Sequence, residues 1–75
     1  MAKKHVRRLI DILGGPTSAG RALKKSRLTM YLWIEKGCVP AKEVLKAELV
    51  VAKFAKEKGI SDPPTRQQLN SEYYP

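Results

Sequence analysis

The chain has few of the residues from which catalytic, metal and disulfide sites are built. Its 75 residues include one cysteine, Cys38, and one histidine, His5. A single cysteine forms no internal disulfide, and Cys38 has no ligand spacing around it, so the sequence excludes a disulfide framework and a zinc site. One histidine and one cysteine with no sign that they meet offer no base–nucleophile pair. We therefore expect no enzyme, no metal and no cofactor.

Long hydrophobic runs are also missing. No stretch approaches the roughly 20 apolar residues of a transmembrane helix. The basic residues Lys3, Lys4, Arg7 and Arg8 precede an apolar run, but that run is too short for a secretory signal and Asp11 interrupts it. We therefore expect no membrane partner and a cytoplasmic protein.

Acidic residues are scarce in one part of the chain only. The net charge is +8, and residues 1–46 hold eleven lysines and arginines against Asp11, Glu35 and Glu43. Residues 47–75 hold four charges of each sign. This asymmetry favours a polyanionic partner such as nucleic acid. A solvated basic face, or a membrane or acidic-protein surface, stays open as an alternative.

The apolar spacing predicts an all-α fold. Val6, Leu9, Ile10 and Leu13 follow the i, i+3, i+4, i+7 pattern of an amphipathic helix. Three further helices are expected, at about 17–25, 27–36 and 41–58. Thr17 or Ser18 is the expected N-cap of the helix at 17–25, and Ser26 is the expected N-cap of the helix at 27–36. The second and third are separated by a tight turn, so the fold class is a small helix-turn-helix bundle of four to five helices with a flexible C-terminal tail.

The third helix is expected to present one side to the major groove of DNA. Met30, Trp33 and Ile34 would hold its inner side. The base-reading candidates lie opposite: Arg27, Leu28, Thr29, Tyr31 and Leu32. Arginine binds guanine O6 and N7 together, and apolar groups suit the thymine methyl. If Leu28 and Leu32 instead complete the core, the helix phase differs by one residue.

A second set of residues is expected to contact DNA phosphates. Hydroxyls and free backbone N–H groups at a helix N-terminus, and lysines beside the turn, give affinity that depends on salt more than on sequence. The candidates are Thr17, Ser18, Lys24, Lys25, Ser26, Lys36 and Lys42. Ordinary capping of the helix is the alternative for Thr17 and Ser18, and simple solvation is the alternative for each lysine.

The helix at 41–58 carries a broader apolar stripe than one contact face requires. We expect it to pack on the core with one side and on a second copy with the other, forming a homodimer through Leu45, Leu49, Val50 and Phe54. The alternatives are a helix sunk deeply into its own monomer and a break near its middle.

The segment GGPTSAGRAL…S…MYLWIEKGCVPA resembles the Cro/YdaS-type helix-turn-helix proteins, which include phage Cro repressors and prophage-encoded regulators. The resemblance covers about residues 5–50. It implies dimeric binding to a pseudo-palindromic operator in double-stranded DNA and repression of transcription. It also matches Arg27, Leu28, Tyr31 and Leu32 with base-reading positions. The chain departs from the family at Lys24, where glycine is usual and a positive φ would cost a lysine about 1 kcal/mol.

Two functions are therefore open. The first is a sequence-specific DNA-binding transcription regulator of the phage or prophage Cro type, with residues 1–60 as the DNA-binding domain and 61–75 as a mobile tail. The second is an antitoxin or protein-interaction adaptor that uses the apolar helix at 41–58 and has only non-specific affinity for DNA.

Overall fold

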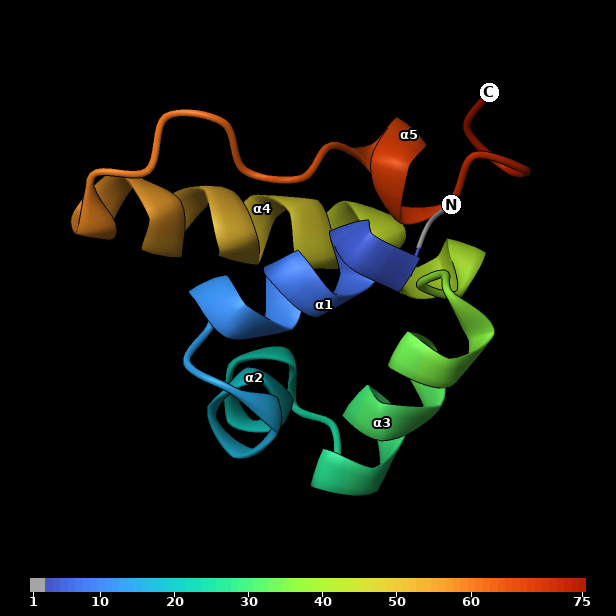
Figure 1. Ribbon diagram of the computed structural model, residues 1–75, viewed down its shortest axis with the longest axis horizontal. Helices are drawn as coiled ribbons and strands as arrows, with labels where there is room; N and C mark the ends of the chain where they lie inside the picture. Colours follow the sequence, from blue (N-terminus) through green and yellow to red (C-terminus); the bar gives the residue numbers. More distant parts are fainter. Residues whose placement is uncertain (1–2) are drawn as a thin grey trace.

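The computed structural model describes residues 3–75 and contains five α-helices (Figure 1). They are α1 (Lys3–Ile12), α2 (Pro16–Leu23), α3 (Arg27–Lys36), α4 (Ala41–Lys58) and α5 (Arg66–Leu69). No strand occurs within this range, so the all-α prediction is confirmed. None of the helices in the described range is long and apolar enough to cross a bilayer.

A single hydrophobic core lies between α4 on one side and α1, α2 and α3 on the other (Figure 1). The spacing of Val6, Leu9 and Ile10 places these side chains on one face of α1, and all three are buried. Met30 and Trp33 of α3 meet them in the same core. The predicted phase of both helices is therefore confirmed.

The helix ends follow local sequence signals in most places. The Ser26 hydroxyl accepts a hydrogen bond from the Thr29 N–H over 3.1 Å, which caps α3 as predicted. Left-handed glycines end α3 and α4, at Gly37 and Gly59. The prediction of Thr17 or Ser18 as the N-cap of α2 is wrong. Gly15 occupies its N-cap position, Pro16 begins it, and no side chain caps it.

Two lysines of α4 cap the other helices. The Lys46 Nζ donates a hydrogen bond to the Leu23 carbonyl over 3.0 Å, at the C-terminus of α2. The Lys58 Nζ donates to the Ile12 carbonyl, at the C-terminus of α1. A cation beside the last carbonyls of a helix satisfies free acceptors and favours the negative end of the helix dipole. Both contacts join distant segments of the chain to α4.

Residues 61–75, which the sequence predicts to be a mobile tail, pack against α4 and the core. The chain runs back along α4 after Gly59 and forms α5 (Figure 1), and Pro64 and Leu69 are buried. The Val39 N–H donates to the Leu69 carbonyl over 2.9 Å, and the Asn70 side chain donates to the Val39 carbonyl over 2.9 Å. Burial of one leucine and these two hydrogen bonds outweigh the polar, proline-containing composition that indicated disorder.

Candidate nucleic-acid interface

The turn between α2 and α3 brings the two helices into close contact. It consists of Lys24, Lys25 and Ser26. The N–H groups of Lys24 and Lys25 donate to the carbonyls of Arg21 and Gly20 over 3.2 and 2.7 Å. This pair of bonds is a Schellman motif, which reverses the chain directly after α2.

Gly20 is required by this close contact. A Cβ atom built at position 20 would lie 2.6 Å from the carbonyl oxygen of Lys25. That oxygen belongs to the backbone, so it moves only if the turn moves. A side chain at position 20 would therefore displace the turn between α2 and α3.

Lys24 adopts the left-handed conformation, with φ 58° and ψ 44°. It is the one non-glycine residue with positive φ in the described chain. The expected energetic penalty of about 1 kcal/mol therefore applies. Its side chain is exposed at the surface of the turn.

The outward side of α3 is an apolar stripe. Leu28, Tyr31 and Leu32 are 67%, 52% and 46% exposed, so Leu28 and Leu32 do not complete the core and the predicted helix phase holds. Arg27 and Lys36 are exposed on the two edges of this stripe, because each residue advances about 100° around a helix. We call Leu28, Tyr31 and Leu32 with these two edge residues the α3 outer face.

Thr29 does not join the α3 outer face. It is half-buried, and its hydroxyl lies 2.9 Å from that of Ser26. Both hydroxyls therefore take part in the N-terminal cap of α3. Their backbone positions still lie at the edge of the turn, beside the exposed Lys24.

The predicted phosphate-contacting residues fall into three groups. Thr17 and Ser18 are exposed at the N-terminus of α2, which lacks a side-chain cap. Lys24, Lys36 and Lys42 are exposed as well, and no ion pair involves them within residues 3–75. Lys25 differs, because its Nζ lies 3.2 Å from a Glu43 carboxylate oxygen.

Two exposed charged residues, Arg21 and Glu35, lie on the same helix faces as these candidates but were not predicted as site residues. Arg21 is exposed on α2, four residues after Thr17, and so lies on the same helix face as Thr17. Glu35 is exposed on α3, seven residues after Leu28. Both could have been found by extending the helical spacing from residues that were already candidates.

Positive charge also surrounds the start of α1. The pKa of His5 is lowered by partial burial and then by the neighbouring charges of Lys4 and Arg8. Arg8 itself pairs with Asp62 over 2.8 Å. Arg8 is therefore engaged with the C-terminal segment, whereas Arg7 stays exposed.

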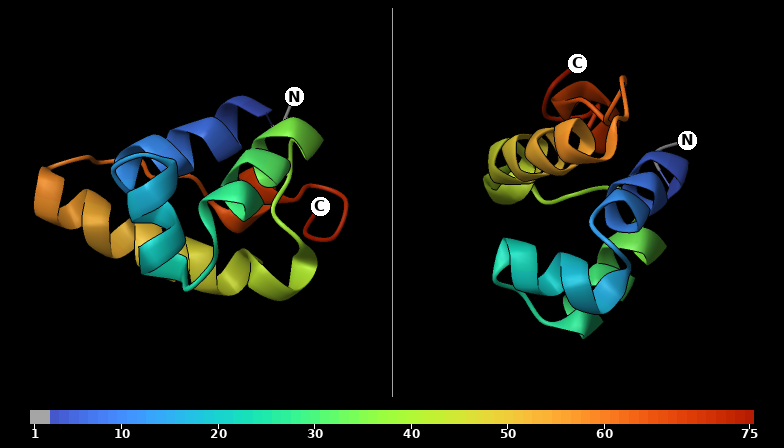
Figure 2. Two further views of the ribbon diagram at one scale, coloured as in Figure 1. Left: turned by 90° about the horizontal axis from the view of Figure 1, so that it is seen from below. Right: turned by 90° about the vertical axis from the view of Figure 1, so that its left-hand side faces the viewer.

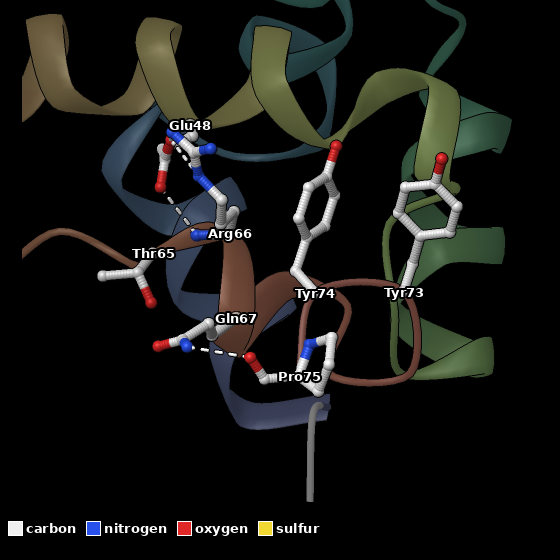
Figure 3. A pocket seen from close by; sticks show the side chains of 7 residues that line it. All are labelled: Glu48, Thr65, Arg66, Gln67, Tyr73, Tyr74 and Pro75. Carbon is white, nitrogen blue, oxygen red and sulfur yellow. Dashed lines mark hydrogen bonds and ion pairs between the residues drawn. The ribbon is translucent and has the colours of Figure 1, made fainter.

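A separate pocket of about 410 Å³ lies between α4 and the C-terminal residues (Figure 3). Its polar groups contact one another. Glu48 accepts hydrogen bonds from the backbone and side chain of Arg66 over 2.7 and 3.1 Å, and Gln67 donates to the Pro75 carbonyl over 3.0 Å. The Arg66 guanidinium also lies 5.8 Å from the centre of the Tyr74 ring. These contacts hold α5 and the chain end against α4.

The four residues predicted for a dimer interface do not share one face of α4. Leu45 and Leu49 are exposed, whereas Val50 and Phe54 pack against the protein's own core. The apolar stripe of α4 is therefore wide because it contains two groups of residues. Most of them, including Val50 and Phe54, pack in the monomer core, whereas Leu45 and Leu49 are the large apolar side chains exposed on the outside of the helix.

No family model, curated protein or solved structure matches the chain. The resemblance to Cro/YdaS-type proteins therefore stays a prediction, and the case for function is built on the geometry of α2, α3 and the turn between them.

Replacing Gly20 with alanine should lower the free energy of unfolding by about 1–2 kcal/mol. Alanine normally stabilises a helix relative to glycine, but here its Cβ would displace the Lys25 carbonyl, and overpacking of this kind costs about 1–3 kcal/mol. Urea denaturation followed by circular dichroism measures the change. Arg21→Ala, at the exposed neighbouring position, should stay within about 0.5 kcal/mol of wild type. A Gly20→Ala variant more stable than wild type would contradict the close contact.

Proposed function

We propose that the protein is a sequence-specific DNA-binding regulator of transcription that places α3 in the major groove. The observation that carries this proposal is the α3 outer face. It exposes three large apolar side chains between two cationic edges, while Met30 and Trp33 fix the helix from the inner side. Large exposed apolar groups gathered on one face usually mark an interaction site.

The chemistry of the α3 outer face suits DNA better than a protein partner. The major groove is about 12 Å wide and admits one α-helix. Leu28 and Leu32 can contact thymine methyl groups, and the Arg27 guanidinium can bind the O6 and N7 atoms of a guanine. Exposed cations on α2, the turn, α3 and α4 would contact the phosphate backbones: Arg21, Lys24, Lys36 and Lys42.

The conformation of Lys24 supports the same proposal. Glycine would occupy the left-handed position at lower energy, yet the chain carries an exposed lysine there. Backbone strain at a surface position is a reason to seek a function for the side chain. Lys24 begins the turn that joins α2 to α3, so we propose that its cation contacts a phosphate.

The proposal includes a homodimer formed along α4. Seen from the side on which α2 and α3 lie, α4 runs along one edge of the molecule (Figure 2, left). A two-fold axis beside that edge leaves α2 and α3 of both copies on one side, where they can enter successive major grooves about 34 Å apart. Leu45 and Leu49, the large exposed apolar side chains of α4, would form the centre of that contact. The matching operator is pseudo-palindromic, and repression in the manner of Cro-type proteins is the regulation we propose.

The second candidate is an antitoxin or adaptor that binds a protein through α4. The exposed apolar surface of α4 is smaller than the sequence indicated, because Val44, Ala47, Val51 and Ala55 lie in the core. Less of this helix is therefore open to a protein partner. We therefore favour the DNA-binding function.

Replacing Arg27 and Tyr31 together with alanine should remove the preference for a selected duplex over a random duplex. Loss of a bidentate contact to guanine alone costs about 1–3 kcal/mol of discrimination. Fluorescence anisotropy with both duplexes at several salt concentrations measures the effect. Arg27→Lys is the informative control, because it keeps the charge and loses the bidentate fork. It should lower the preference while leaving the salt dependence nearly unchanged. Equal binding of all duplexes by the wild type would contradict the proposal.

Leu49→Asp should weaken both self-association and DNA affinity. Leu49 is 72% exposed in the monomer, so the variant should fold, while two facing aspartates would repel one another in the dimer. Sedimentation equilibrium and duplex titration on the same sample measure the two effects. Ser71→Asp adds the same charge at an exposed position outside α4 and should leave both unchanged. A monomeric wild type that binds its duplex tightly would disprove the dimer.

A further inference from the structure

Glu35 is the acidic member of the row of side chains on the outside of α3. Leu28, Tyr31, Leu32 and Glu35 follow the i, i+3, i+4, i+7 spacing, so they form one continuous line along the helix. All four are exposed. If the apolar members of this line enter a groove, the carboxylate of Glu35 enters it with them.

The Glu35 carboxylate has no cationic partner in the described residues 3–75, where the ion pairs are Arg8–Asp62, Lys25–Glu43 and Arg66–Glu48. Its neighbours on the helix surface, three and four residues earlier, are Leu32 and Tyr31. Neither of them is a cation. In a groove between two phosphate backbones, this carboxylate would lower affinity unless a base edge offered it a hydrogen-bond donor.

Cytosine provides such a donor. In the major groove its exocyclic N4 amino group donates, and it presents no acceptor of its own, whereas adenine places the acceptor N7 beside its N6 donor. A carboxylate only accepts, so it matches cytosine. We infer that Glu35 makes the protein select cytosine at one position of its DNA site.

This position differs from the one that Arg27 reads. The two residues are eight apart, which is about 12 Å along the helix axis, whereas successive bases in one strand rise about 3.4 Å. The inference rests on the proposed function, and it adds a second polar contact to the apolar ones. Arg27 would select guanine, and Glu35 would select cytosine farther along the groove.

The test is selection of bound duplexes from a random pool at about 150 mM salt, with wild type, Glu35→Gln and Glu57→Gln. We expect the wild type to prefer cytosine about tenfold at one position. Glutamine has a donor and an acceptor and suits adenine N6 and N7, so Glu35→Gln should change that position from cytosine to adenine and keep the guanine. Glu57→Gln makes the same charge change at an exposed position of α4 and should keep the wild-type consensus.

The outcomes separate the two proposals. In one outcome, the wild type and Glu35→Gln select the same consensus, and Glu35→Gln binds all duplexes more tightly by the same factor as Glu57→Gln. Glu35 is then only a solvated acid, so the inference fails while the proposed function stands. If Glu35→Gln loses the cytosine without gaining adenine, Glu35→Ala should lose it too, and the inference holds. If the wild type selects no consensus at all, both the inference and the proposed function fail.

Discussion

The arrangement of the proposed DNA-binding side depends on the contact between Gly20 and the turn that follows α2. Only a residue without a Cβ allows the Lys25 carbonyl to approach this closely, since a Cβ would lie 2.6 Å from it. The contact fixes where α3 begins relative to α2. Met30 and Trp33 then set the rotation of α3, because both are buried in the core. The outward direction of Arg27, Leu28 and Tyr31 is a consequence of these two constraints.

Lysines have two distinct roles in this protein. Lys46 and Lys58 are exposed overall, but their Nζ atoms donate hydrogen bonds to the last carbonyls of α2 and α1. Lys24, Lys36 and Lys42 are exposed and keep their charges at the surface. Lys24, Lys36 and Lys42 matter for the proposed function because they leave cations on the turn, on α3 and at the start of α4 with no ion-pair partner in residues 3–75.

Local patterns predicted most of the fold. The 3.6-residue period gave the phase of α1 and α3, and Ser26 and Gly37 marked the ends of α3, because these features depend only on neighbouring residues. The positions of Leu69, Lys58 and Phe54 could not be predicted in this way. Leu69 reaches the core through contacts with Val39, thirty residues earlier, and Lys58 binds Ile12, which lies 46 residues earlier. In the candidate site, the same limit applies to Lys25, whose partner Glu43 lies on α4.

The central claim is that DNA contacts the outside of α3. It is tested most directly by nuclear magnetic resonance of the 15N-labelled protein during titration with a selected duplex. The account predicts that the amide signals of Arg27, Leu28, Tyr31, Leu32 and the turn at 24–26 shift most, with Trp33 shifting little. Largest shifts at Leu45, Leu49 and the C-terminal residues 65–75, with no change along α3, would contradict it.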